Sequence, residues 1–508
     1  MENLLKRQPV STARYIINAR EECGVSGEFT LPDYCPDVAV VLKCMVSPCV
    51  QNRQWSGEQL LVDGMANVRV LYLDEERRAV RSVEFGLPIS CALRADGYAD
   101  MTPVEVTMST KYVNCRAVGP RRLEVRGAVV VAATAQTACE TEVATCGARE
   151  GLYTRTCEIA TSCPGRMVEK MLTVNEMLEF PEHLPAAEML LGGECRAVMQ
   201  ECKLLVGKAI VKGCIFVHQL YTSNLKNGAT QCLDFVIPFS QILDVEGLAE
   251  GMPYWVNAQI LSDTERCVVG PDGENTLLDL SVKLLIQLQT FTQECTEVVL
   301  DAYDTGCPVT VETEDKSFVL YKGCSTEHSV LPMQIPLPVG QVSEIVDVWV
   351  QCAECEAVCQ NGTATIHGRL FICVLGRDAD GLIWYTEHPE DYRLEYPCKG
   401  NAADVSIVVT ELRYRVIGEQ LELQVGVCLQ MRMMQLQSCR VMQNLCLHTE
   451  TPYTPQRMTA MLYYAQAGES VWDIGRRCHA SPTEICAENH LKDEVLRQSM
   501  ALLIPMVS

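Results

Sequence analysis

The stretch VDGMANVRVLY, residues 62–72, alternates with a period of two residues. Val62 and Val68 face one way while Asp63 and Arg69 face the other, which is typical of a β-strand with one buried face. Gly64 interrupts the apolar face, and a glycine inside a strand indicates a bulge or a close approach of another backbone. The fold can be worked out from this strand because the chain repeats it.

Two further segments carry the same pattern, VKGCIFVHQLY at residues 211–221 and IHGRLFICVLG at residues 366–376. In all three copies a proline lies 32 residues before the glycine, in the pairs Pro32 and Gly64, Pro181 and Gly213, and Pro336 and Gly368. A second alternating strand follows in each copy, at residues 123–131, 278–288 and 421–429. Strands that alternate in this way form antiparallel sheets with one face packed and the other in water, so the chain is predicted to be mainly β.

The repeat predicts three tandem antiparallel β-sandwich-like modules, spaced by about 150 residues. They span residues 12–135, 165–292 and 331–432. The third is divergent, since Gly340 and Gly376 stand where the first two copies have a proline and a tyrosine. Residues 136–164 and 433–458 are interpreted as linkers and residues 293–330 as a connection. Residues 459–508 form a small closing domain.

Composition restricts the partners. The 508 residues include 42 Lys and Arg against 65 Asp and Glu, a formal net charge of −23. This charge opposes phosphate binding and leaves no basic block for an anionic bilayer, so we expect no nucleic acid partner and no direct membrane insertion. The first twenty residues lack the apolar core of a secretory signal, and no stretch approaches the roughly 18 apolar residues of a spanning helix. A cytoplasmic location is expected.

The cysteines and the missing motifs argue against metal and catalytic chemistry. Most of the 28 cysteines are interpreted as reduced core residues. Cys352, Cys355 and Cys359 contain one CxxC, but nothing completes a four-ligand zinc site, and alternation sends Cys352 and Cys355 to opposite faces. Because the motifs of phosphate-binding loops, zinc hydrolases and serine hydrolases are missing, we expect no enzyme, cofactor or metal. An enzyme would require polar groups converging in an apolar pocket.

Residues 463–505 read differently from the repeats. A short strand ends at Ala467-Gly468, where Gly468 is expected to turn the chain with a positive φ. Ser470 is a good N-cap for a first helix, and Ser481 with Pro482 is a strong start signal for a second. Residues 501–505 supply a closing strand, so the predicted order is strand, helix, helix, strand.

The repeat resembles the SPOCS domain, which occurs in tandem in proteins of endospore-forming bacteria, especially clostridia. Residues 178–221 are the closest stretch, and VVLDAYDTGC at residues 298–307 resembles a segment that often follows the second copy. The tail resembles a LysM domain through Tyr464, Gln466, Gly468 to Trp472, Ile474, Gly475, Ser481, Ile485, Asn489, Leu491 and Leu503 to Pro505. The resemblance implies a role in building the spore envelope, on the mother-cell side of the spore surface.

The LysM resemblance also implies a binding groove. Its walls would be Gly468, Glu469, Ser470 and Val471 on one side and Asn489, His490 and Leu491 on the other, with Trp472 beside them. For two residues of this groove, two alternative roles stay open. Trp472 is either a sugar platform or a half-buried wedge, and Asn489 either touches the ligand or caps its helix.

Two functions follow from the resemblance. LysM domains of SPOCS-plus-LysM spore proteins dock a coat morphogenetic protein, the basement-layer ATPase, which implies a non-enzymatic assembly scaffold of the coat and cortex. LysM domains also bind N-acetylglucosamine polymers such as peptidoglycan, which would make the β modules spacers. This sequence departs from the LysM pattern at Glu469-Ser470 and Ser499-Met500. Peptidoglycan lies beyond a membrane, so protein docking is the preferred interpretation and peptidoglycan binding the alternative.

Overall fold

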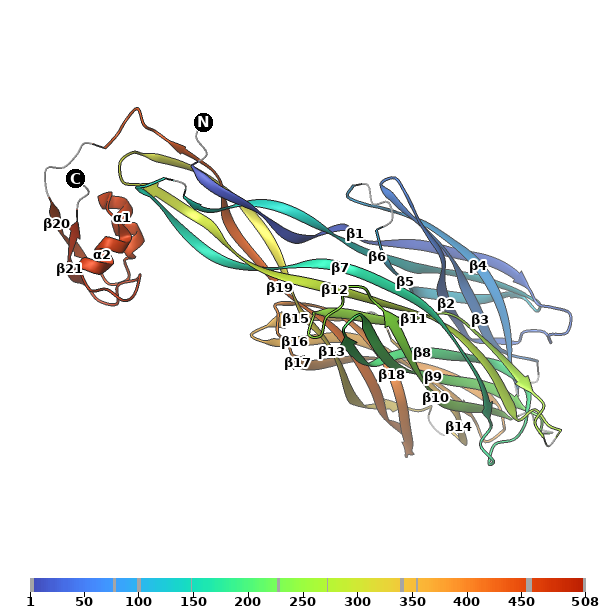
Figure 1. Cartoon of the computed structure of the whole chain (residues 1–508). Helices are drawn as coiled ribbons and strands as arrows, with labels where there is room; N and C mark the ends of the chain where they lie inside the picture. Colours follow the sequence, from blue (N-terminus) through green and yellow to red (C-terminus); the bar gives the residue numbers. More distant parts are fainter. Residues whose placement is uncertain are drawn as a thin grey trace.

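A computed structural model describes residues 4–75, 79–97, 102–147, 149–225, 229–271, 273–338, 342–352, 355–453 and 459–505. Across these residues strands dominate, every strand pair is antiparallel, and the only helices are two short ones near the C-terminus (Figure 1). The prediction of a mainly β, antiparallel chain is confirmed. Neither helix of the described part is long and apolar enough to cross a membrane.

The first repeat, called unit 1, contains six strands in two three-stranded sheets that share one core. The sheets have the orders β1-β6-β5 and β2-β3-β4. Val62 and Ile89 from one sheet pack in the same cluster as Val106 and Val131 from the other. The strands are β1 (Leu5–Thr30), β2 (Val40–Ser56), β3 (Gln59–Leu73), β4 (Val80–Arg94), β5 (Glu105–Gly119) and β6 (Arg122–Gly147).

Units 2 and 3 repeat this arrangement. Unit 2 has the sheets β11-β12-β7 and β10-β9-β8, and unit 3 has β13-β19-β18 and a four-stranded sheet of β14 to β17 around β16. The inner faces of each pair of sheets again pack against each other in a shared core. The strands are β7 (Leu152–Glu179), β8 (Ala187–Leu205), β9 (Lys208–Ser223), β10 (Thr230–Asp244), β11 (Tyr254–Val268), β12 (Leu277–Asp304), β13 (Val309–Pro336), β14 (Glu344–Cys352), β15 (Glu356–Gln360), β16 (Thr363–Arg377), β17 (Ile383–Pro397), β18 (Ala402–Ile417) and β19 (Gln420–Leu447).

The repeated glycine lies where the central strand is approached closely, as the sequence predicts. A Cβ atom at Gly64 would lie 2.5 Å from the carbonyl oxygen of Cys49, and one at Gly213 would lie 2.3 Å from that of Val198. At Gly368 the neighbour is the hydroxyl of Tyr392, at 2.3 Å. All three distances are shorter than real Cβ contacts. Gly64 and Gly213 face backbone carbonyls and therefore require glycine, whereas at Gly368 the Tyr392 side chain would have to move.

The proline spacing is not the same in unit 3. The second alternating strands begin at residues 123, 278 and 421. In each unit the carbonyl two residues before that start accepts a hydrogen bond from a backbone N–H, which belongs to Leu31, Phe180 and Leu337 in units 1, 2 and 3. Pro338, which follows Leu337, is therefore the structural counterpart of Pro32 and Pro181. Pro336 is not, so the 32-residue spacing in the third copy is coincidental. Gly340, named above for the same copy, lies outside the described residues.

The predicted linker at residues 136–164 is instead the continuation of β6 and β7. The pairs β1–β6, β7–β12 and β13–β19 run on beyond the units and bundle together as a stalk (Figure 1). Residues 293–330 and 433–447 belong to it in the same way. The stalk interior contains Val10, Val143, Ile159, Val298, Phe318 and Val441. Each strand of a six-stranded bundle buries only a narrow row of side chains, which is why the apolar signal along any one strand is weak.

The three units meet through the sheet face that alternation assigned to solvent. Leu71, Leu220 and Leu375 each lie seven residues after the repeated glycine, and all three belong to one buried cluster. Three equivalent residues in one cluster require the units to be arranged around a common axis. Beside this cluster His218 of unit 2 bridges Asp234, at 2.7 Å, and the buried Asp347 of unit 3, at 3.0 Å.

The last described residues form a separate C-terminal unit. Its elements are β20 (Ala460–Ala465), α1 (Val471–Cys478), α2 (Pro482–Glu488) and β21 (Met500–Pro505), and β20 pairs with β21. The side chains of Ser470 and Ser481 accept hydrogen bonds from the third residues of α1 and α2, as N-caps do. Val471, Ile474, Ile485, Leu502 and Ile504 form the centre of its core.

Candidate functional site

The first wall of the predicted groove pairs with residues 494–496. Gly468 has a φ of +91°, as expected for its turn. Its N–H donates to the carbonyl of Leu496 at 2.8 Å, and the Leu496 N–H donates back to the carbonyl of Glu469 at 2.9 Å. The N–H of Val471, which is buried, donates to the carbonyl of Glu494 at 2.8 Å. Residues 468–471 therefore face the later part of the loop between α2 and β21, and not the residues 489–491 that directly follow α2.

The polar side chains of this wall are occupied within the unit. The Glu469 carboxylate accepts hydrogen bonds from the N–H of Gln466, at 2.9 Å, and the hydroxyl of Tyr463, at 3.1 Å. These bonds, with the one from Arg477, hold the pKa of Glu469 below its usual range. Ser470 caps α1 by accepting from the N–H of Asp473 at 3.1 Å.

The second wall is held by Asn489. Its side-chain amide donates to the carbonyls of Ile485, at 2.9 Å, and Leu503, at 2.7 Å, and accepts from the Leu503 N–H at 2.7 Å. Asn489 therefore ends α2 and ties it to β21, which corresponds to the capping alternative. The exposed His490 has a left-handed φ of 52°, and Leu491 packs partly on the unit's core.

Trp472 faces the stalk and not the predicted groove. Its indole N–H donates to the Asp301 carboxylate at 2.9 Å, and its ring packs edge-on against Tyr303 with centroids 4.8 Å apart. Arg476, one turn further along α1, pairs with the same carboxylate. Asp301 and Tyr303 belong to β12 at the end of the stalk, so the half-buried wedge describes Trp472 better than the sugar platform.

Further contacts fix the C-terminal unit on the stalk tip. The buried Tyr303 hydroxyl donates to the carbonyl of Ala480 at 2.8 Å. The rings of Tyr453 and His479 stack with centroids 3.6 Å apart. Asp301 and Tyr303 lie within VVLDAYDTGC, the segment singled out by resemblance, but the sequence contained no indication that they would contact Trp472. Figure 1 shows the unit at the end of the stalk that is remote from units 1 to 3.

Replacing Asp301 with alanine is expected to release the C-terminal unit from the stalk. The change removes the acceptor of both Trp472 and Arg476, and hydrogen bonds to charged groups contribute about 2 kcal/mol each. Amide hydrogen exchange should become faster at α1 and at the tip of β12. Asp315→Ala, which removes an exposed carboxylate paired with Arg440 on the stalk, is the control. Unchanged exchange at α1 in Asp301→Ala would contradict this docking.

Opposite its core, the sheet of the C-terminal unit exposes an apolar face. Leu462 and Tyr464 of β20 are 56% and 76% exposed, and Leu503 of β21, which pairs with Leu462, is 40% exposed. These three residues are called the apolar face. Large apolar side chains gathered on an exposed surface are typical of protein-interaction sites.

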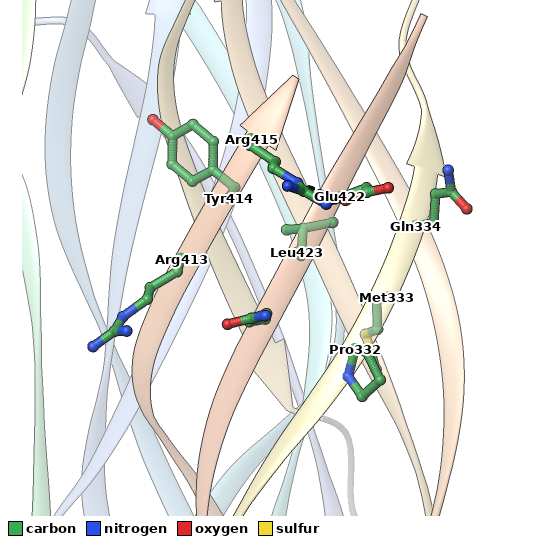
Figure 2. Close-up of a pocket in the computed structure, with 9 residues that line it drawn as sticks. Pro332, Met333, Gln334, Arg413, Tyr414, Arg415, Glu422 and Leu423 are labelled. Carbon is green, nitrogen blue, oxygen red and sulfur yellow. Dashed lines mark hydrogen bonds and ion pairs between the residues drawn. The ribbon is translucent and has the colours of Figure 1, made fainter. Parts of the chain in front are cut away.

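A groove of about 600 Å³ crosses unit 3 (Figure 2). It is lined by strands β13, β18 and β19, and the one carboxylate in its lining, Glu422, is paired with Arg415 at 2.7 Å. A groove of about 490 Å³ lies at the matching place in unit 1, on β1, β5 and β6, with different residues. A hollow that recurs with unrelated side chains follows from the shape of the sheet.

Residues 37–118 and 187–264 match the family model described as SipL, SPOCS domain. Both regions are similar to the SPOCS domain. The match supports a sporulation-associated function for this chain. The first SPOCS-like region corresponds to β2–β5 of unit 1, and the second corresponds to β8–β11 of unit 2. No curated protein and no solved structure matches the chain.

Proposed function

We propose that this protein is a non-enzymatic scaffold of the spore envelope that docks a spore coat morphogenetic protein of the basement-layer ATPase type through a LysM-like C-terminal unit. The observation that carries the proposal is the apolar face formed by Leu462, Tyr464 and Leu503. It points away from the unit's core, while the α1 residues Trp472 and Arg476 are used against the stalk. The three β-sandwich units and the stalk act as the support that presents this face.

Protein docking is favoured over glycan binding by the state of the predicted groove. The side chains of Glu469 and Asn489 are engaged within the unit, and Trp472 is engaged with the stalk. A sugar would have to break hydrogen bonds that hold the unit together. An apolar protein surface can cover Leu462 and Tyr464 without breaking any of them, and aromatic side chains are enriched at interaction hot spots.

The double variant Leu462→Ser/Tyr464→Ser is expected to lose the partner. Hot-spot residues cost 2 kcal/mol or more when truncated, so affinity should fall by about 30-fold or more. The measurement is co-purification from sporulating cells, with the chain lacking residues 459–508 as the negative reference.

Val236→Ser is the matched control, because Val236 is similarly exposed but lies on unit 2. Sedimentation with purified peptidoglycan tests the alternative, with Ser470→Ala as the groove variant. Retained partners in the double variant, or peptidoglycan binding that Ser470→Ala abolishes, would refute protein docking through the apolar face.

A further inference from the structure

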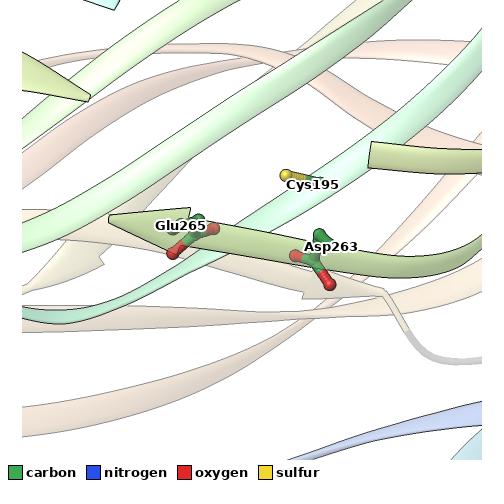
Figure 3. Close-up of side chains that lie close together, drawn as sticks. All are labelled: Cys195, Asp263 and Glu265. Atoms are coloured by element: carbon green, nitrogen blue, oxygen red, sulfur yellow. The ribbon is translucent and has the colours of Figure 1, made fainter. Parts of the chain in front are cut away.

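A small polar cluster lies in unit 2 at the end of its hydrophobic core. Cys195 of β8 and Asp263 and Glu265 of β11 approach one another from the two sheets (Figure 3). The Cys195 sulfur and one oxygen from each carboxylate all lie within 4.8 Å of one another. Asp263 is exposed while Cys195 and Glu265 are half-buried, so the cluster opens to solvent on one side.

The equivalent positions of the sister units are not acidic. Strand register aligns Cys195 with Val46 and Val350, because each pairs with the residue four after the repeated glycine. The strands β11, β5 and β18 can be aligned in the same way by their pairing with the second repeated strand of each unit. Asp263 then corresponds to Val113 and Leu412, and Glu265 corresponds to Cys115 and Tyr414. Val113, Cys115 and Leu412 pack partly on the cores of their units, and unit 2 has carboxylates at these positions. Placing carboxylates at the end of a core is unfavourable unless something compensates their charge.

Gln219 supplies an independent observation. Its side chain is 0% exposed, and its amide nitrogen donates to the carbonyl of Leu220 at 2.8 Å. Its Oε1 atom has no hydrogen-bond partner among the described residues, and neither does Oε1 of Glu265. Both oxygens point at the same place, since a Cβ atom on Gly193 would lie 2.4 Å from the first and 2.6 Å from the second. Valines, Val70 and Val374, occupy the position of Gln219 in the sister units.

We propose that Cys195, Asp263, Glu265 and the amide oxygen of Gln219 bind a zinc ion. Zinc takes four ligands and accepts thiolate and carboxylate together, whereas calcium and magnesium prefer oxygen alone, so the thiol favours zinc over these two ions. On binding, the Cys195 thiol releases its proton to solvent and the sulfur coordinates as thiolate. The ion would link β8 to β11 and so join the two sheets of unit 2, where the sequence led us to expect no metal.

The charge around the cluster is compatible with this ion. Three anionic ligands would carry three negative charges, of which zinc balances two. Arg69 of unit 1 donates to the carbonyl of Gly193, and its positive charge acts on Glu265. The site therefore lies next to the contact between units 1 and 2, and zinc would be expected to stabilise that contact as well.

The test is metal binding by the full chain, stripped with a chelator and kept reduced. Zinc alone should bind at one ion per chain, and cobalt as a substitute should give the near-ultraviolet charge-transfer absorption of a thiolate ligand. Cys195→Val and Asp263→Leu introduce residues that the sister units tolerate, so both variants should fold. Loss of a ligand should weaken binding by at least about 100-fold, since even residues that only support a ligand cost 10- to 100-fold.

Cys352→Ser is the matched control, since Cys352 is exposed and belongs to the CxxC segment considered above. It should leave zinc affinity and the cobalt absorption unchanged. The proposal is overturned if the native chain binds no stoichiometric zinc. It is equally overturned if Cys195→Val and Asp263→Leu bind zinc like the native chain, or if Cys352→Ser alone abolishes binding.

Discussion

Replacing Gly213 with alanine is expected to destabilise unit 2 by about 3 kcal/mol, the upper part of the range for overpacked cores. The new Cβ would lie 2.3 Å from the carbonyl oxygen of Val198 and 2.5 Å from the ring of Phe239. The ring can rotate, but the carbonyl belongs to the backbone of the neighbouring strand. The strand β8 must therefore separate from β9, which weakens the ladder between them. The measurement is the urea midpoint of unfolding.

Gly24→Ala is the matched control for this prediction. Gly24 also lies in a strand, but no atom of the described residues lies within 4 Å of the position of its Cβ. Alanine there should leave the midpoint unchanged or raise it slightly, because it reduces the entropy of the unfolded chain. Equal midpoints for the Gly213 and Gly24 variants would show that the close approach does not constrain the strand.

Replacing His218 with glutamine is expected to weaken the junction between units 2 and 3 by about 3 kcal/mol, as happens when one partner of a buried ion pair is removed. Asp347 is only 3% exposed, and His218 is its cationic partner. Burial alone would lower the pKa of the imidazole, but the carboxylates of Asp347 and Asp234 outweigh it and raise the pKa to about 10. Glu194 lies close enough to His218 to interact with it as well.

The sign of the pH dependence follows from that shift. The pKa of His218 is higher in the folded chain than the value of about 6.5 expected after unfolding. Its stabilisation is therefore complete below about pH 6.5 and is lost as the pH rises through about 10. Urea midpoints of the native chain and His218→Gln should differ most at pH 6.5 and converge toward pH 10. His367→Gln, which changes an exposed histidine on β16, is the control, and a gap that does not depend on pH would contradict this assignment.

The strands and their inward faces could be predicted because alternation is a local property. Val62, Val211 and Ile366 lie on predicted strands and are fully buried. The face through which the three units meet could not be predicted, because alternation does not report contacts between units. Leu71 lies on the face that alternation assigns to solvent, and only the arrangement of three units around one axis buries it. Residues 136–164 were misread because small Thr, Ala and Cys side chains give little periodic signal.

The candidate site was predicted in part. Capping residues such as Ser470 and Ser481 act over three or four residues, so the sequence was sufficient to place them. Trp472 contacts Asp301, which is 171 residues away, and no spacing rule covers such a contact. The cluster of Cys195, Asp263 and Glu265 did leave a signal, because charges occupy positions that are apolar in the sister units. That signal becomes readable only once strand register aligns the three copies.

The stalk has a mechanical consequence. Its strands β7 and β12 continue for residues 152–164 and 291–304, which at about 3.3 Å per residue corresponds to roughly 40 Å. Six hydrogen-bonded strands resist bending far better than a single peptide connection. Anything captured at the far end is consequently kept at a set distance from the bulky repeats, so this chain has the properties of a rigid arm with a fixed reach.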